Sequence, residues 1–222
     1  MQTLFFGSIG TLAETSQLQL EAFNVAFAQA GLDWHWTEDA YQQMLATAGG
    51  VQRIADFAKS KGVSVDVEAL HRSKSKIYQD LLQTRDLEPR AGVLEAMNMV
   101  KNHGGELGLV TSTSLANVTA LLDAVGIAHH AFDLIVHRGL VEQPKPAPDA
   151  YLFALEALKA TPSNVVAVED NPDGALAAIQ SGVRCLATPG EFHAHNVFPD
   201  GVELQSRLDL APYLASADQA AA

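Results

Sequence analysis

Short apolar runs alternate with helical patterns over most of this 222-residue sequence, and that alternation restricts the fold more than any other feature. The apolar runs, each bounded by turn residues, are TLFF at 3–6, LGLV at 107–110, LIV at 134–136 and VVAV at 165–168. Between them, the ranges 113–124, 149–158 and 173–181 carry apolar residues at helical spacing. Continuous apolar runs that alternate with helices are typical of buried parallel strands. The sequence therefore predicts an α/β fold with a doubly wound parallel sheet.

The stretch from about 16 to 86 breaks this alternation. It carries helical patterns at 17–30, 37–46, 50–60 and 66–84 and no convincing strand. Gly31 is placed to end the first of these helices, and Pro89 lies where the chain would return to the sheet. We therefore expect a core domain of residues 1–15 and 87–222 and an inserted helical domain of residues 16–86.

The charge excludes several classes of partner, and the cysteine usage indicates the compartment. Lys and Arg number 14 against 26 Asp and Glu, and the net charge of −12 repels nucleic acid and anionic membrane surfaces. The single cysteine, Cys185, rules out an intrachain disulfide and favours the cytosol. No stretch approaches the ~18 apolar residues of a membrane span. We expect a cytoplasmic protein with no nucleic-acid or membrane partner, while protein partners remain unknown from the sequence.

Four polar loops follow the four apolar runs. They are GSIGT, TSTS, QPKP and EDNPDG, the third after a short connection. Because ligands bind outside the carboxyl ends of the strands in such sheets, we expect these loops to share one crevice.

The second and third loops carry groups that suit an anion. The hydroxyl of Thr111 and the backbone N–H groups of Ser112 and Thr113 precede a helix, whose positive end attracts phosphate. Simple N-capping by Ser112 or Thr113 would explain the same residues equally well. Lys145 is fixed between Pro144 and Pro146, which suits phosphate binding. A surface proline-rich turn with an incidental lysine is the alternative.

The fourth and first loops differ in their chemistry. Glu169 and Asp170 are adjacent carboxylates that repel each other unless a cation such as Mg²⁺ or Lys145 lies between them. The first loop, residues 7–11, has the glycine-bearing turn of an anion-binding loop and no carboxylate.

In this order the motifs resemble the haloacid dehalogenase-like hydrolase superfamily, whose members mostly transfer phosphoryl groups through an aspartyl phosphate. The segments TAGGVQRI at 47–54, TSTSLANV at 111–118, QPKPAPDAYLFALEAL at 143–158 and AVEDNPDGALAAIQSG at 167–182 are most similar to its beta-phosphoglucomutase-like subgroup. Within that subgroup they are similar to the Calvin-cycle xylulose bisphosphate phosphatases. The resemblance implies a Rossmann-like core with an inserted helical cap.

The resemblance assigns roles to the polar residues of the core. Thr111 would be the phosphate-holding hydroxyl, with Ser112 beside it at the substrate. Lys145 would be the lysine of the third motif. Glu169 and Asp170 would be the acids on the side of a bound Mg²⁺.

In the cap, the resemblance assigns Arg53 and the loop at Gly50 to the distal phosphate of the substrate, which a guanidinium can bind in bidentate fashion. An exposed helix arginine without a ligand is the alternative. The ligand implied is a small phosphorylated molecule or an inorganic anion.

The first motif departs from the family pattern. The pattern is Asp-x-Asp-Gly-Thr, in which the first Asp is the nucleophile and the second the general acid/base, whereas this chain has Gly7, Ser8, Ile9, Gly10 and Thr11. Ser8 is no substitute, because we expect its side chain to point away from the face of its neighbours, with no base adjacent. Ile9 still offers the backbone carbonyl that the family lends to Mg²⁺, so a weakened metal site is expected.

Two hypotheses follow. The first is a catalytically impaired phosphatase homologue that binds a phosphorylated sugar or similar anion. The second is an active sugar-phosphate phosphohydrolase with rescued chemistry, such as a metal-bound water as nucleophile. Gly7 and Ile9 favour the first, while the retained Thr111, Lys145 and the two acids support the second.

Overall fold

The structure is a computed structural model that describes residues 3–45 and 49–213. It divides into two compact units, one formed by the chain up to Glu14 and from Leu87 onward, the other by Thr15–Asp86. Residue 46 of the predicted second helix and residues 47 and 48 of TAGGVQRI lie outside the described residues. No helix within the described ranges is long and apolar enough to span a membrane.

The first unit contains a six-stranded, all-parallel sheet in the order β3-β2-β1-β4-β5-β6. The strands are β1 (Thr3–Phe6), β2 (Glu106–Val110), β3 (Leu134–Val136), β4 (Val165–Glu169), β5 (Arg184–Ala187) and β6 (Glu203–Leu204). The four predicted strands and the predicted α/β fold class are confirmed. The last two strands were not predicted, because β5 is only four residues long with an exposed Arg184 and β6 is a two-residue exposed edge.

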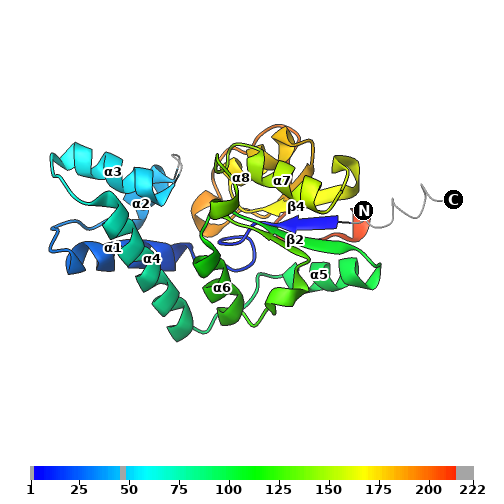
Figure 1. Ribbon diagram of the computed structural model, residues 1–222, viewed down its shortest axis with the longest axis horizontal. Helices are drawn as coiled ribbons and strands as arrows, with labels where there is room; N and C mark the ends of the chain where they lie inside the picture. Colours follow the sequence, from blue (N-terminus) through cyan, green and yellow to red (C-terminus); the bar gives the residue numbers. More distant parts are fainter. Residues whose placement is uncertain (1–2, 46–48, 214–222) are drawn as a thin grey trace. The chain divides into compact units, whose positions relative to one another are not determined.

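Helices cover both faces of this sheet. They are α5 (Val93–Asn102), α6 (Leu115–Ala124), α7 (Asp149–Ala157) and α8 (Pro172–Gln180). Figure 1 shows α5 and α6 on one face and α7 and α8 on the other. Short 3₁₀ turns lie at His129–Ala131, Arg138–Leu140, Pro162–Asn164 and Glu191–His193. The sequence analysis missed α5, although Val93, Met97 and Val100 bury one face of it.

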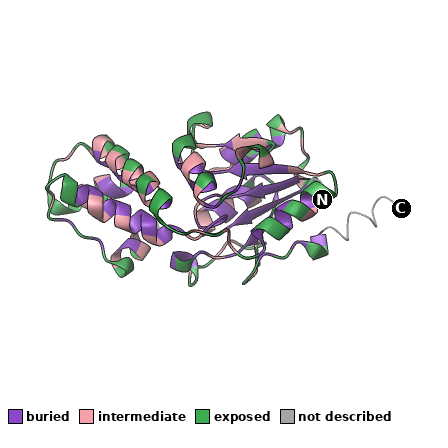
Figure 2. Cartoon of the chain, turned by 90° about the horizontal axis from the view of Figure 1, so that it is seen from below, coloured by how far each residue is buried: buried purple, intermediate pink, exposed green. Residues whose placement is uncertain are grey.

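The central position of β1 determines where a ligand site can form. Strands β2 and β3 lie on one side of β1, and β4, β5 and β6 lie on the other. The direction in which successive strands are added to the sheet therefore reverses between β1 and β4. Phe6 is in register with both Leu109 and Val168. Figure 2 shows these strands as a buried layer. The loops that follow β1, β2 and β4 therefore meet at the switch point of the sheet.

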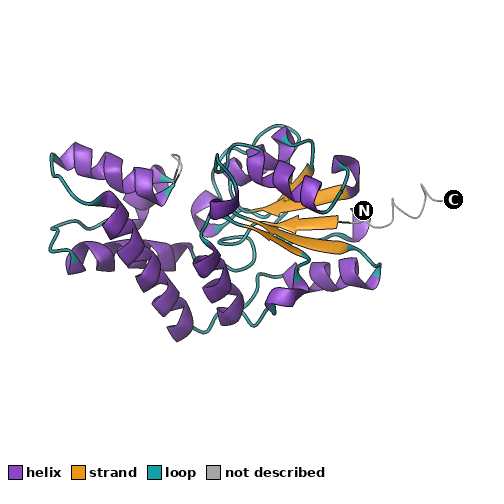
Figure 3. Ribbon diagram, viewed as in Figure 1, coloured by secondary structure: helices purple, strands orange, loops and turns teal. Residues whose placement is uncertain are grey.

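The second unit is the helical insertion. It consists of α1 (Ser16–Gln29), α2 (Glu38–Met44), α3 (Gly50–Lys61) and α4 (Val67–Thr84), and its described residues form no strand (Figure 3). Its centre is aromatic, because Trp36 packs with its ring centroid 4.7 Å from those of both Phe23 and Phe27. We call this unit the cap.

Local sequence accounts for the ends of the cap helices. The side chains of Thr37 and Asp66 cap α2 and α4 by accepting hydrogen bonds from Ala40 N and Ala69 N. Gly31 follows the end of α1 at φ +70°, as the sequence predicts.

Candidate anion site at the carboxyl ends of the strands

The loop after β1 keeps the turn that the sequence predicts. Gly7 N donates to Val168 O at 2.9 Å, and Gly10 N donates to Ala13 O at 2.9 Å. Gly10 has φ +80°, and a Cβ added there would lie 2.2 Å from Asp170 Oδ2. Only glycine therefore fits at this position.

Two hydroxyl groups connect the first loop to the second. Ser8 Oγ lies 2.7 Å from Thr111 Oγ1, and both residues are buried. Thr113 N donates to Thr111 Oγ1 at 3.2 Å. Ser8 thus turns toward the second loop, which the sequence analysis did not anticipate. Its hydrogen-bond partner is a hydroxyl group rather than a base.

The N-cap of α6 is Ser114, whose side chain accepts from Asn117 N at 3.3 Å. The alternative that Ser112 or Thr113 caps this helix is therefore wrong. Ser112 is exposed, and its Oγ instead accepts a hydrogen bond from Lys145 N at 3.1 Å. The second and third loops are joined through this contact.

Lys145 is not an incidental surface lysine, because its side chain is only 8% exposed. Its ammonium donates to Val110 O at 2.7 Å and forms an ion pair with Glu169. Tyr151 OH lies 3.5 Å from the same nitrogen. The lysine is thus held at the end of β2, next to Thr111.

Glu169 is fully buried, and it accepts hydrogen bonds on Oε1 from Lys145 and from Tyr151 OH. Burial, together with the charge of Glu169, raises the pKa of Tyr151 well above its ordinary value. The phenol therefore stays protonated and continues to donate. Sequence reasoning missed Tyr151; its only signal was its place in the PDAY segment that follows the lysine.

The side-chain space beside Gly7 is already filled. A Cβ added to Gly7 would lie 2.4 Å from Thr11 Oγ1 and 2.8 Å from Glu169 Oε2. Both distances are shorter than real Cβ contacts, so both side chains would have to move to admit any other residue.

Asp170 has a different environment from its neighbour. Burial, and then the charge of Glu169, raise the pKa of Asp170 from 3.8 to about 7, although hydrogen bonds from Thr11 and Asn171 oppose this. Thr11 Oγ1 donates to Asp170 Oδ1 at 2.8 Å. Lys145 pairs with Glu169, so the predicted cation relieves the charge of only one of the two acids.

Within the described ranges, no three His, Cys, Asp or Glu side chains come close enough together to hold a metal ion. A metal at Asp170 would depend on backbone oxygens and on the ligand for its other contacts. A proton on Asp170 would compete with it.

Arg90 is a positioning residue that the sequence analysis also missed. Its guanidinium donates to Gly10 O at 2.5 Å, to Thr188 O at 2.7 Å and to Pro189 O at 2.9 Å. These bonds join the first loop to the loop after β5. Its signal in the sequence was its place directly after Pro89, where the chain returns to the sheet.

In the cap, Arg53 is 7% exposed, so the alternative of an exposed helix arginine is wrong. Its Nε donates to Met44 O at 3.1 Å, and its guanidinium carbon lies 5.4 Å from the centre of the Tyr41 ring. Gly50 begins α3, and a Cβ there would lie 2.8 Å from His71 Nε2. Both predicted residues thus border a crowded, cationic part of the cap.

A family model described as haloacid dehalogenase-like hydrolase matches residues 10–188. This chain belongs to that family. The match begins at Gly10, after the two positions at which this chain lacks the carboxylates of the family pattern. The family and the Rossmann-like core with a helical cap that the resemblance implied are confirmed.

Individual members of the family resemble this chain over most of its length. The chain is 36% identical over 203 residues to protein CbbY of Cereibacter sphaeroides, covering 89% of this chain and 88% of that one. A crystal structure of CbbY from Rhodobacter sphaeroides with phosphate has a TM-score of 0.88 at 34% identity, covering 95% of this chain and 96% of that one. A mutant of the same protein in complex with xylulose-1,5-bisphosphate has a TM-score of 0.87 at 34% identity, covering 93% and 94%.

Proposed function

We propose that this protein is a catalytically impaired phosphatase homologue that binds a phosphorylated sugar or a similar anion. The observation that carries the proposal is the first loop, where Gly7 and Ile9 provide no carboxylate and Thr11 and Glu169 fill the space beside Gly7. Loss of a nucleophile has cost about a millionfold in turnover in another enzyme, and loss of a general acid/base costs about a hundred- to ten-thousandfold.

The binding half of the site supports an anionic ligand. Thr111 and Ser112 lie before α6, and the backbone and side chain of Lys145 are fixed next to them. CbbY has been crystallised with phosphate and with xylulose-1,5-bisphosphate, which favours a sugar phosphate of this class. Arg53 and Gly50 of the cap are proposed to contact a second anionic group of the ligand.

Magnesium fits this site only weakly. Asp170 and the backbone carbonyl of Ile9 would hold it, whereas the Glu169 carboxylate is bound to Lys145 and Tyr151. When bound, Mg²⁺ would offset the negative charge of a phosphate group.

We also infer a cytoplasmic location without a nucleic-acid partner. The net charge of −12 and the single buried Cys185 support this inference.

The second candidate is an active sugar-phosphate phosphohydrolase. The observation in its favour is that the loops bring Thr111, Lys145, Glu169 and Asp170 to one end of the sheet. This candidate requires a nucleophile other than residue 7, and it makes the opposite prediction for turnover by the wild-type protein.

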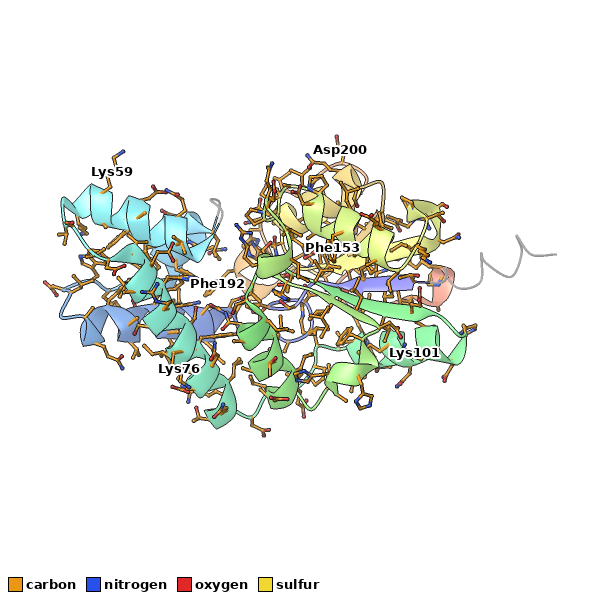
Figure 4. All side chains as sticks on the ribbon, in the orientation of Figure 1. Lys59, Lys76, Lys101, Phe153, Phe192 and Asp200 are labelled. Carbon is orange, nitrogen blue, oxygen red and sulfur yellow. The ribbon has the colours of Figure 1, made fainter. Side chains whose placement is uncertain are left out.

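Binding and turnover are tested with xylulose 1,5-bisphosphate and Mg²⁺. We expect a rise in melting temperature in the wild-type protein, a smaller rise in Lys145→Ala and in Thr111→Val, and no phosphate release from any of the three. Thr111→Val leaves the Lys145–Glu169 pair in place and so guards against misfolding of the first variant. Lys101→Ala is the control, because Lys101 lies on α5 in an exposed ion pair with Asp133 (Figure 4).

Wild-type turnover that Lys145→Ala abolishes would refute impairment and establish the second candidate. Equal melting shifts in the wild type, Thr111→Val and Lys145→Ala would refute the binding site.

Restoration of the missing groups gives a further test. In Gly7→Asp with Ile9→Asp, two carboxylates re-enter the first loop, and residue 7 has no positive φ to oppose the change. Thr11 and Glu169 must move, so we expect a less stable protein whose phosphate release exceeds that of each single variant. A folded but inactive double variant would mean that the site has lost more than two side chains.

A further inference from the structure

Ser8 occupies the position of the first motif that the family pattern leaves unspecified. It stands between Gly7 and Ile9, the two positions that lack a carboxylate. Ser8 is 4% exposed and Thr111 is 6% exposed, and their hydroxyl oxygens lie 2.7 Å apart. The first motif of this chain thus has a buried hydroxyl group in contact with the second loop.

This pair of hydroxyl groups has one hydrogen more than it uses. Each hydroxyl has one hydrogen to donate and two lone pairs that accept. One of the two hydrogens lies in the bond between Ser8 and Thr111, and Thr113 N donates to Thr111 Oγ1 at 3.2 Å. Among the residues that the structure describes, the second hydrogen has no acceptor. A buried donor without an acceptor is costly, so an acceptor from outside the chain would stabilise the pair.

The order of these hydrogen bonds favours Ser8 as the residue that holds the unused hydrogen. Thr111 Oγ1 accepts from the backbone of Thr113, and a hydroxyl group that accepts one hydrogen bond donates a stronger one. The bonds then run from Thr113 N through Thr111 to Ser8. Ser8 Oγ is therefore the donor at the end of the chain of bonds.

Backbone donors of the same two loops are also unused. Ser8 N, Ile9 N and Ser112 N have no hydrogen-bond acceptor in the described part of the chain. A phosphate group, whose oxygens accept hydrogen bonds, matches such a set of donors. Because Gly7 and Ile9 carry no carboxylate, a dianion at these loops meets no negative charge from either position.

We propose that Ser8 is a further ligand-binding residue, whose hydroxyl donates to the phosphate group of the ligand and, with the unused N–H groups of the two loops, holds that group without a metal ion. The inference rests on the proposed function for the chemical class of the ligand. It adds a side chain to which the family pattern assigns no role, and it makes binding independent of Mg²⁺.

The test follows sulfate binding to the full chain by ¹H–¹⁵N NMR at pH 6, in EDTA and separately with Mg²⁺. Sulfate has only acceptor oxygens at this pH and cannot be turned over. The amide signals of Ser8, Ile9 and Ser112 report on these two loops, so sulfate bound elsewhere on the chain does not enter the result. Burial, and then the charge of Glu169, raise the pKa of Asp170 to about 7, so Asp170 is mostly protonated at pH 6. Sodium chloride at matched ionic strength controls for screening.

Two variants remove the donor in different ways. Ser8→Ala deletes the hydroxyl, whereas Ser8→Cys keeps the size of the side chain and replaces the hydroxyl by a weak donor. Ser181→Ala is the matched control, because Ser181 is 7% exposed and its Oγ donates to Ala178 O at the C-terminal end of α8. We expect sulfate to bind at least about tenfold more weakly to both Ser8 variants and with unchanged affinity to the control. In the wild type, the affinities in EDTA and in Mg²⁺ should agree within about twofold.

Two results would overturn the inference and leave the proposed function standing. If both Ser8 variants bound sulfate as tightly as the wild type, the hydroxyl pair would only join the two loops. If the wild type bound sulfate in Mg²⁺ but not in EDTA, a metal ion would be required. In either case Lys145→Ala would still weaken binding if the proposed function is correct. Equal binding by Lys145→Ala and the wild type would count against the proposed function instead.

Discussion

Glu169→Gln removes the counter-ion of Lys145 and leaves the shape of the site almost unchanged. The side chains of the pair are 8% and 2% exposed, so the ammonium would remain buried without a negative partner. A contact pair at an effective dielectric constant of about 20 is worth about 4 kcal/mol. Glu169 also repels Asp170, and relief of that repulsion offsets part of the loss. We expect the free energy of unfolding to fall by about 3 kcal/mol, within the range for breaking a buried pair.

Urea unfolding followed by far-UV circular dichroism measures this change at pH 8. With a typical urea dependence of about 2 kcal/mol per molar, the midpoint should fall by about 1.5 M. Both tryptophans lie in the cap, so their emission, recorded alongside, reports on the unit that the substitution does not touch.

Glu95→Gln is the matched control, because the Glu95–Arg207 pair is more than 60% exposed on both sides and should change stability by less than about 1 kcal/mol. If Glu169→Gln cost no more than this control, the argument that the buried pair holds Lys145 in place would be refuted.

Three other predictions test separate parts of the structure. Burial lowers the pKa of Lys74 from 10.5 to about 7, so between these pH values the unfolded chain binds more protons than the folded protein, and the free energy of unfolding of the wild type should rise with pH. In urea titrations at pH 7, Lys74→Met should be more stable than the wild type by about 4 kcal/mol, and its stability should lack this rise with pH. Burial raises the pKa of Asp170 to about 7, so its contribution to stability is present below about pH 4 and lost as the pH rises through 7. Without metal, Asp170→Asn should therefore gain about 2–4 kcal/mol at pH 8 and little at pH 4; equal effects at both pH values would contradict the assignment. Gly10→Ala adds a clash with Asp170 to the strain of a positive φ, whereas Gly126→Ala, at φ +67° in open space, adds strain alone. By thermal unfolding the first should cost about 3 kcal/mol and the second about 1 kcal/mol, and similar costs would mean that Asp170 moves aside freely.

The sequence was most informative about elements whose signal is local. The runs at 3–6, 107–110, 134–136 and 165–168 became strands because a continuous apolar run can be buried on both faces of a parallel sheet. The rule that ligands bind at the carboxyl ends then placed four loops together from the sequence alone. β5 and β6 were not found, because a four-residue strand and a two-residue edge have too little pattern to separate them from loops.

The sequence by itself also determined that residues 7 and 9 carry no carboxylate, since this depends only on residue identity. Only the tertiary structure decided what surrounds them. Glu169 and Thr11 fill the space beside Gly7. Tyr151 and Lys145 both donate to Oε1 of Glu169, and Arg90 donates to three backbone carbonyls. The tertiary structure likewise buried Lys74 with no carboxylate in ion-pair distance among the residues that the structure describes, on a helix where Lys76, two residues away, is 69% exposed. Periodicity records which face of an element is apolar, whereas these contacts join residues far apart in the chain and exist only once the elements have packed.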